Sequence, residues 1–171
     1  TKEPGGSALG KVLSRQLKQE KANIHPFCEL FLFAASRAQL TSEVIRPALE
    51  REEIVISDRF SDSTVAYQGY GRGLDLSLIE IVNNAATQGL RPDLNDFLGA
   101  ENEKGLGRKQ FKKDRFEREE IAFHQRVREG YLKMAAQEPE RWFVVDASKP
   151  KAEIEKIVWE RVKQLLSLRQ A

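Results

Sequence analysis

Cysteine is almost absent from this chain. Cys28 is the single cysteine among 171 residues, which excludes an internal disulfide and a cysteine-based metal cluster. Because Cys28 lies in an apolar stretch, we expect it to be a buried structural thiol. A chain without disulfides fits a reducing compartment best, so the sequence predicts a cytoplasmic location.

Long apolar runs and an excess of one charge are also missing. No stretch of about 18 apolar residues occurs, as a membrane-spanning helix would need, and residues 1–4 do not resemble a signal peptide. The 28 basic and 26 acidic residues nearly cancel, which leaves a net charge of +2. The composition therefore gives no reason to expect a nucleic acid or a membrane as a partner.

Length and patterning favour one α/β domain. A chain of 171 residues with 40% hydrophobic content is long enough to bury one substantial core, so we expect a single domain over residues 1–171. Three short apolar segments predict strands at residues 53–57, 94–98 and 142–146. Such strands are typical of a parallel sheet that is flanked by helices on both faces.

Helical periodicity separates the predicted strands. Apolar residues follow Ser7, a favourable N-cap, at helical spacing, and a second such segment begins at residue 76 and ends before Gly89. The last helix is expected to pack one stripe of side chains against the sheet, formed by Ile154, Ile157, Val158, Arg161, Val162, Leu165 and Leu166.

A further helix, expected at residues 27–38, carries an aromatic residue and an arginine on one face. Arg37 follows Phe33 by four positions, so the two side chains share a helical face. Either Phe33 is an ordinary core residue beside an arginine that extends to solvent, or the pair binds a ligand. Pro47 is expected to end or kink this helical segment at Arg46.

Charged residues follow the first predicted strand. Ligands of parallel α/β proteins bind outside the carboxyl ends of the strands, and Asp58 and Arg59 lie there. The two could form a structural ion pair, or Arg59 could bind phosphate while Asp58 holds Mg²⁺ directly or through water. Arg72 lies in a glycine-rich turn at residues 69–73, which could be structural or could belong to the same site.

Six short motifs follow one another along the chain. They occupy residues 1–6, 29–37, 44–49, 57–73, 91–94 and 114–117. In this order and spacing they resemble the motifs of bacterial thymidylate kinases. The resemblance implies a P-loop NTPase fold of the nucleoside-monophosphate kinase type. It also implies transfer of the γ-phosphoryl group of ATP to dTMP, which gives dTDP for dTTP synthesis.

The same resemblance assigns the base of dTMP to a small set of side chains. Phe33 would stack on the thymine ring and Arg37 would hydrogen-bond the base, so the pair on the helix would recognise a pyrimidine. Ser63, Thr64 and Gln68 would lie near the base.

The sugar and the acceptor phosphate would be contacted by Glu3, Pro4, Arg59, Tyr67 and Arg72. Of these, Tyr67 would stand where a ribose 2′-hydroxyl would clash. Glu3 and Pro4, together with Gly5, would form a wall that faces the sugar and the phosphate. Arg59 would hold the acceptor phosphate, and Arg72 would add charge there. Asp58 would organise Arg59 or, indirectly, the shell of Mg²⁺.

A charged segment at about residues 107–116 resembles the lid that closes over ATP in this family. A charge run between helices is otherwise a solvated loop. Within the family, an arginine of the lid can stabilise the charge that develops during phosphoryl transfer. Arg108 and Arg115 are both candidates for this catalytic role, and Arg108 is also a candidate for binding ATP.

The chain departs from the family pattern in one main respect. It contains no G-x-x-x-x-G-K-[ST] loop, whose backbone amides and lysine cradle the phosphates of ATP. We expect this loop, together with the central first strand of the sheet, in a segment upstream of Thr1. A smaller departure is the pair Gly99 and Ala100, where the family strand usually ends in an aspartate.

Three alternatives to a dTMP kinase remain at the level of sequence. The chain could be a non-catalytic module that keeps an acceptor pocket and has lost the donor loop, or a kinase for another nucleoside monophosphate. A nucleic-acid binder, suggested by the pI of about 8.7, has little support because the charges balance. The resemblance further implies that the protein is a homodimer.

Overall fold

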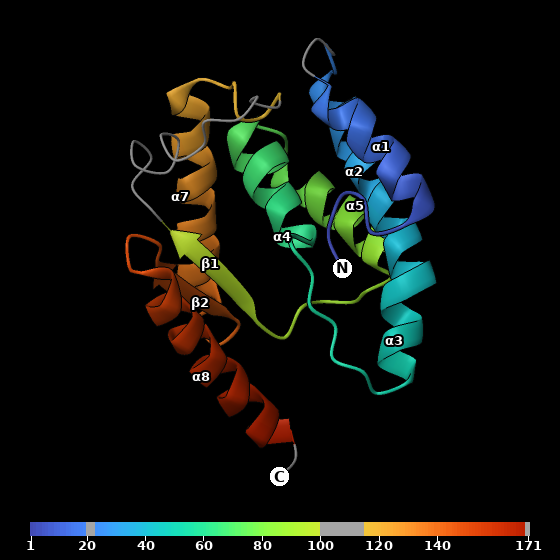
Figure 1. Cartoon of the computed structure of the whole chain (residues 1–171). Coiled ribbons are helices and arrows are strands. Elements are labelled where there is room, and N and C mark those ends of the chain that lie inside the picture. Colours follow the sequence, from blue (N-terminus) through green and yellow to red (C-terminus); the bar gives the residue numbers. More distant parts are fainter. Residues whose placement is uncertain (20–22, 100–114, 170–171) are drawn as a thin grey trace. The chain divides into compact units, whose positions relative to one another are not determined.

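The computed structural model of the chain describes residues 1–19, 23–99 and 115–169 (Figure 1). The chain divides into two compact units. The first comprises residues 1–91 and 111–130, and the second comprises residues 92–110 and 131–171. The prediction of one domain over the whole chain stays a prediction.

Helices dominate the first unit. In chain order they are α1 (Ala8–Lys18), α2 (Pro26–Leu40), η1 (Thr41–Ile45), α3 (Arg46–Glu50), α4 (Ser61–Thr64), η2 (Val65–Gly71), α5 (Leu76–Thr87) and the first part of α7 (Ile121–Gln137). The elements η1 and η2 are π-helical. Apolar side chains from several of these helices form the core, among them Leu17, Leu30, Leu40, Ala66 and Ile79.

Two predicted helices begin and end where local signals place them. Ser7 caps α1 by accepting a hydrogen bond from the backbone N–H of Gly10 at 3.0 Å. Asp75 caps α5 in the same manner, with Ser77 as the donor at 2.8 Å. Gln88 ends α5 in the left-handed conformation, with φ at 54°, just before Gly89. The predicted helices are therefore confirmed.

The helix predicted at residues 27–38 is confirmed as α2, but Pro47 does not end the helical path. The chain continues through the π-helical η1 into α3, which runs to Glu50. Pro47 lies in the first turn of α3, where a missing backbone N–H costs little. Arg46 marks a change in helix type and not an end.

Cys28 is exposed, so the prediction of a buried thiol is wrong. Only one face of α2 is buried, and Leu30 and Ala34 are on it. Cys28 lies on the other face, where Phe27 and Phe31 are 41% and 54% exposed. An apolar stretch does not by itself show which side of a helix faces the core.

Residues 53–57 do not form the predicted strand. A single parallel bridge joins the following residue, Asp58, to Lys2, and the side chains of Ile54 and Ile56 are 66% and 78% exposed. A strand needs a ladder of hydrogen bonds to a neighbouring strand. Among the described residues, residues 53–57 have no such ladder, and the chain near Thr1 supplies only the one bridge to Asp58.

The second unit contains the two strands β1 (Asn95–Gly99) and β2 (Trp142–Asp146). They run parallel, with Asn95 opposite Trp142 and Gly99 opposite Asp146. The predicted bounds were correct for β2 and one residue early for β1. The helix α8 (Lys151–Arg169) follows β2.

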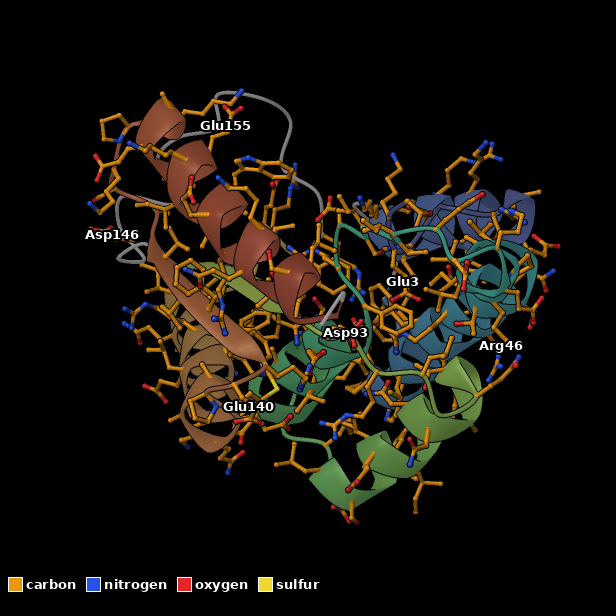
Figure 2. All side chains as sticks on the ribbon, turned by 90° about the horizontal axis from the view of Figure 1, so that it is seen from below. Glu3, Arg46, Asp93, Glu140, Asp146 and Glu155 are labelled. Atoms are coloured by element: carbon orange, nitrogen blue, oxygen red, sulfur yellow. The ribbon has the colours of Figure 1, made fainter. Side chains whose placement is uncertain are left out.

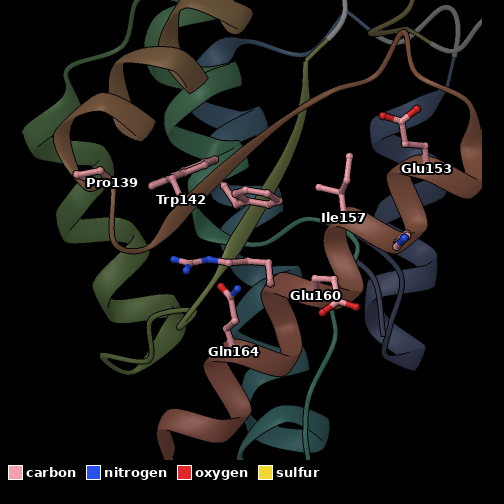
Figure 3. A pocket seen from close by; sticks show the side chains of 9 residues that line it. Pro139, Trp142, Glu153, Ile157, Glu160 and Gln164 are labelled. Carbon is pink, nitrogen blue, oxygen red and sulfur yellow. The ribbon is translucent and has the colours of Figure 1, made fainter.

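Helices cover both faces of these strands. On one face, the ring of Phe97 stacks on Tyr131 of α7, with centroids 4.7 Å apart. On the other face, Phe143 of β2 and Ile157 of α8 line a hollow of about 610 Å³. Figure 3 shows the side chains around it. Successive side chains of a strand point to opposite faces, so the expected α/β layering is confirmed here. The predicted stripe of α8 is half-buried, as expected.

The hollow in the second unit is lined by none of the predicted site residues. Next to it, the carboxyl of Asp96 has its pKa raised by burial, although the charge of Arg161 opposes this shift. No described helix is both long and apolar enough to cross a membrane.

Candidate active site

One face of α2 carries three of the side chains that matter most in the first unit. Glu29, Phe33 and Arg37 follow one another at intervals of four residues, so they lie in a row along the helix. The two charged ends of the row bind α4 and η2, because Arg37 contacts Thr64 and Glu29 contacts Gln68. Phe33 lies between these two contacts.

Arg37 is 1% exposed, and its guanidinium is held from several sides. Nε donates to Oε2 of Glu3 at 2.8 Å, Nη1 donates to Oδ1 of Asn83 at 2.6 Å, and Nη2 donates to Oγ1 of Thr64 at 2.8 Å. Nη2 also lies 3.4 Å from the carbonyl oxygen of Phe60. The interpretation of an arginine that extends to solvent is therefore wrong.

Glu3 forms the ion pair with Arg37 from the N-terminal segment of the chain. Glu3 is labelled in Figure 2 and is 5% exposed. Burial raises the pKa of its carboxyl, while the charge and the hydrogen bond of Arg37 act in the opposite direction. Its second oxygen, Oε1, is buried without a hydrogen-bond partner among the described residues. Pro4, which follows through a cis peptide bond, is also buried.

Arg59 has an unusual backbone conformation. Its φ is +67°, a left-handed conformation that is uncommon for a non-glycine residue and is often found at functional sites. The Oγ of Ser57 donates to the carbonyl oxygen of Arg59 at 2.8 Å. The guanidinium lies 4.9 Å from the ring centroid of Tyr67, and Nη2 donates to the hydroxyl of Tyr67 at 3.2 Å. Asp58 and Arg59 are both exposed.

Aromatic rings connect the residues expected to bind the base with those expected to bind the phosphate. Phe116 lies 5.8 Å from Phe33 and 6.0 Å from Tyr67, measured between ring centroids. Tyr67 is also 6.0 Å from Phe123 of α7. Phe116 immediately follows Arg115, so the end of the predicted lid contacts the two rings expected to face the nucleotide.

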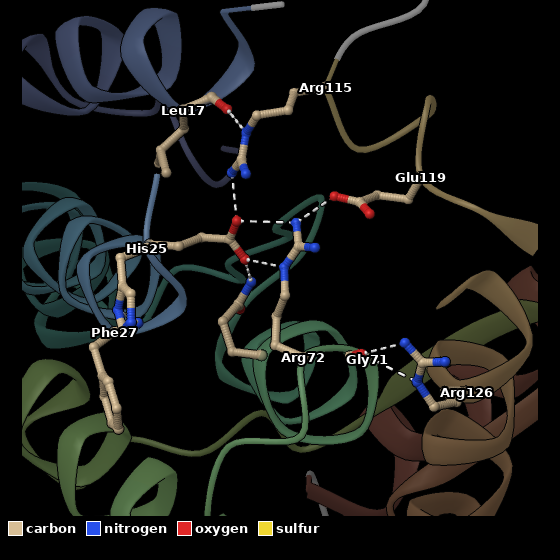
Figure 4. Close-up of polar contacts among 10 residues, drawn as sticks. Leu17, His25, Phe27, Gly71, Arg72, Arg115, Glu119 and Arg126 are labelled. Carbon is tan, nitrogen blue, oxygen red and sulfur yellow. Dashed lines mark hydrogen bonds and ion pairs between the residues drawn. The ribbon is translucent and has the colours of Figure 1, made fainter. Parts of the chain in front are cut away.

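A fully buried carboxylate organises the opposite end of the α2 row (Figure 4). Glu29 is 0% exposed. Its Oε1 accepts hydrogen bonds from Gln68 at 2.7 Å and from Arg72 at 3.2 Å. Its Oε2 accepts from Arg72 at 3.2 Å and from Arg115. Arg72 reaches a second carboxylate, Glu119, at 2.6 Å.

The two arginines of this cluster are largely neutralised by their neighbours. Burial alone would lower the pKa of Arg72, but the hydrogen bonds that it donates to Glu119 and Glu29 raise it. Arg115 is also tied to α1, because its Nε donates to the carbonyl oxygen of Leu17 at 3.1 Å. Both guanidinium groups therefore have acidic partners inside the protein.

The remaining predicted residues are placed as follows. Ser63 is half-buried, and its backbone N–H donates to the carbonyl oxygen of Phe60 at 3.1 Å. Arg108 and most of the lid predicted at residues 107–116 lie outside the described residues. Within the described ranges, no group of three acidic, histidine or cysteine side chains is positioned to hold a metal ion.

Comparison with known proteins decides the family. The family model for thymidylate kinase matches residues 1–158. The chain belongs to the thymidylate kinase family. A thymidylate kinase of Dehalococcoides mccartyi is 49% identical over 99% of this chain and 83% of its own length. That of Deinococcus radiodurans is 43% identical over 96% of this chain and 81% of its own length.

A solved structure of the family has the same fold. The crystal structure of thymidylate kinase from Ehrlichia chaffeensis is similar with a TM-score of 0.72 and 30% sequence identity, over 92% of this chain and 77% of that one. The predicted family, fold class and enzyme class, an ATP:dTMP phosphotransferase, are confirmed. The alternative of a non-catalytic module is not favoured.

Three residues that organise the candidate site have no role in the predictions from the sequence. They are Asn83, Glu29 and Phe116, of which Glu29 and Phe116 lie within two of the six motifs. Glu29 could have been found, because an acidic residue inside an apolar helix must have partners. Asn83 follows the core residue Ile79 by four positions, which places a polar group on the buried face of α5.

Proposed function

We propose that this member of the thymidylate kinase family binds dTMP in the first unit and transfers the γ-phosphoryl group of ATP to the phosphate of dTMP. The observation that carries the proposal is Arg59. It combines a strained backbone, an exposed guanidinium and an orienting contact with Tyr67. An arginine that is held in this way suits a phosphate group.

The base of dTMP is proposed to stack on Phe33. This ring lies between Arg37 and Gln68 along the interface of α2 with α4 and η2, so two polar side chains flank any planar group placed on it. Ser63 and Thr64 would complete the surroundings of the base. Tyr67 would face the sugar, with Glu3 and Pro4 as the opposing wall.

Phosphoryl transfer requires positioned positive charge more than covalent chemistry. Arg59 would hold the acceptor phosphate in line with ATP. Arg115 is bound by Glu29 and by the carbonyl of Leu17, which favours a role in anchoring the lid and leaves Arg108 as the proposed transition-state cation. Arg72 is paired with two carboxylates, so we propose that it supports the site and adds only remotely to the charge at the phosphate.

Mg²⁺ is proposed to accompany ATP. This ion commonly keeps several waters and binds through one or two carboxylates together with substrate phosphates, and the exposed carboxylate of Asp58 beside Arg59 suits that mode. When bound, Mg²⁺ neutralises charge on the transferred group. The donor loop expected upstream of Thr1 stays a prediction.

A coupled assay of ATP and dTMP turnover tests this function. Arg59→Ala in the full-length protein should lower kcat/KM on the order of 100-fold or more, as the loss of a positioned charge does in other enzymes. Because Arg59 is exposed, thermal stability should stay near that of the unmodified protein.

Arg59→Lys is the matched control, because it keeps the charge and removes the bidentate fork. Partial activity is expected from it. Near-normal turnover by Arg59→Ala would show that the acceptor phosphate is held elsewhere. Parallel assays with other nucleoside monophosphates test the alternative of a different acceptor.

We also propose that the protein is a cytoplasmic homodimer. Phe27 and Phe31 are one helical turn apart on α2 and remain 41% and 54% exposed, so they form an apolar face that a second copy could cover. A single, exposed cysteine fits the reducing conditions of the cytoplasm.

A further inference from the structure

Glu29 imposes a direction on the side chain of Gln68. A carboxylate that binds guanidinium groups accepts hydrogen bonds from them, and the carboxylate of Glu29 is bound by two such groups. The contact of 2.7 Å between Glu29 and Gln68 must therefore be made by the amide nitrogen of Gln68. The opposite orientation of the amide would place two acceptors against each other.

The orientation leaves Gln68 with one unused group of a defined kind. Gln68 is 1% exposed, and its Oε1 receives no hydrogen bond from any described residue. With Nε2 engaged by Glu29, the side chain offers a ligand an acceptor. An amide that could rotate freely would offer either an acceptor or a donor.

Arg37 presents the complementary group at the other end of the α2 row. Four acceptors, from Glu3, Asn83, Thr64 and Phe60, share the five N–H groups of its guanidinium. The second N–H of Nη1 has no acceptor among the described residues. A planar ring on Phe33 would therefore meet a donor on the side of Arg37 and an acceptor on the side of Gln68.

This pattern matches the edge of a keto pyrimidine and opposes that of cytosine. Thymine and uracil present an acceptor at O4 and a donor at N3–H, whereas cytosine presents an amino donor at N4 and an acceptor at N3. We propose that Glu29 is a specificity-determining positioning residue, which selects dTMP over dCMP by fixing the amide of Gln68. The inference rests on the proposed function, because it takes dTMP to bind on Phe33.

The test is the change Glu29→Gln in the full-length protein, with binding of dTMP, dCMP and dUMP measured by calorimetry. A glutamine at position 29 can donate as well as accept, so the amide of Gln68 can turn over. We expect the preference for dTMP over dCMP to fall by about 10-fold or more, in line with the cost of one unpaired buried group.

The preference for dTMP over dUMP should not change, because these two bases have the same hydrogen-bonding edge. A purely structural effect of the substitution would weaken the binding of all three nucleotides to the same extent. Glu119→Gln is the matched control, since it also removes one carboxylate from Arg72 but belongs to a residue that does not contact Gln68. It should leave the ratio of dTMP to dCMP affinity unaltered.

An unchanged ratio in Glu29→Gln would overturn the proposal, as would an equal loss of preference in Glu119→Gln. If Glu29→Gln does not fold, Glu29→Asp gives the same comparison, because the shorter side chain keeps the charge and cannot reach Gln68 and the arginines together. An unmodified protein with no preference for dTMP over dCMP would contradict the proposed function itself.

Discussion

At the scale of single residues, the site depends on charged side chains that are almost completely buried. Arg37 is 1% exposed and Glu29 is 0% exposed, and neither would be tolerated there without partners. Each is bound by side chains from other elements, so each charge also holds those elements together. Phe33 lies between them on α2, so the side chains on either side of its ring are held in place.

The proposed stacking of the base on Phe33 gives a prediction at this scale. Phe33→Ala should weaken dTMP binding by about 10-fold or more, because stacking of a base on an aromatic ring contributes roughly 1–3 kcal/mol. Calorimetry on the full-length protein is the measurement.

Phe33→Leu separates stacking from packing. Leucine retains most of the apolar volume beside Phe116 but has no π face. The variant should therefore keep its thermal stability and still bind dTMP more weakly. Unaltered affinity in both variants would rule out the stacking role.

At the scale of elements, the site is built where helices change type. Tyr67 and Gln68 lie in the π-helical η2, which directly continues α4, and π-helical turns are frequent at functional sites. The helix α5 contributes Asn83, the partner of Arg37. The position of Asn83 depends on where α5 begins, and this is set by Asp75.

The Asp75 cap predicts a pH dependence of stability. Hydrogen bonds from the backbone and hydroxyl of Ser77 lower the pKa of Asp75 below its ordinary value of 3.8. The unfolded chain therefore binds more protons at this group in the window below that value, so the free energy of unfolding rises with pH there. The contribution of Asp75 is fully present above pH 3.8 and is lost as the pH falls through the lowered pKa of the folded state.

Asp75→Asn isolates this effect, because asparagine caps a helix without titrating. Thermal denaturation of both proteins is measured between about pH 2.5 and pH 6. The protein with Asp75 should lose stability faster than Asp75→Asn as the pH falls. Parallel curves across this range would refute the assignment.

At the scale of the whole molecule, the exposed face of α2 predicts the oligomeric state. Phe31→Asp places a charge where a second copy is proposed to pack, so the mass measured by light scattering should fall from that of two chains to that of one. Thermal stability of the isolated chain should hardly change, since Phe31 is 54% exposed.

The comparable change Trp159→Asp serves as the control. Trp159 is 55% exposed on α8, outside the face proposed for association, so a dimer should persist. If Phe31→Asp remained dimeric, as Trp159→Asp is expected to, the assignment of the interface to α2 would be contradicted.

The sequence by itself determined the features that depend on near neighbours. The Ser7 cap, the bounds of β2 and the half-buried stripe of α8 follow from caps and periodicity within one or two turns. These signals are local, and the structure confirmed them. The six motifs sufficed for the family, which the comparisons confirm, and the substrate-binding set that they imply stays a prediction.

Only the tertiary structure decided how the buried charges are paired and which segments find a partner. Arg37 meets Glu3 and Asn83 across 34 and 46 positions, and Glu29 meets Arg115 across 86. The same holds for residues 53–57, whose pattern was that of a strand but whose strand character depends on a neighbour. Local propensity cannot specify such contacts, because their free energy exists only once distant parts of the chain have come together.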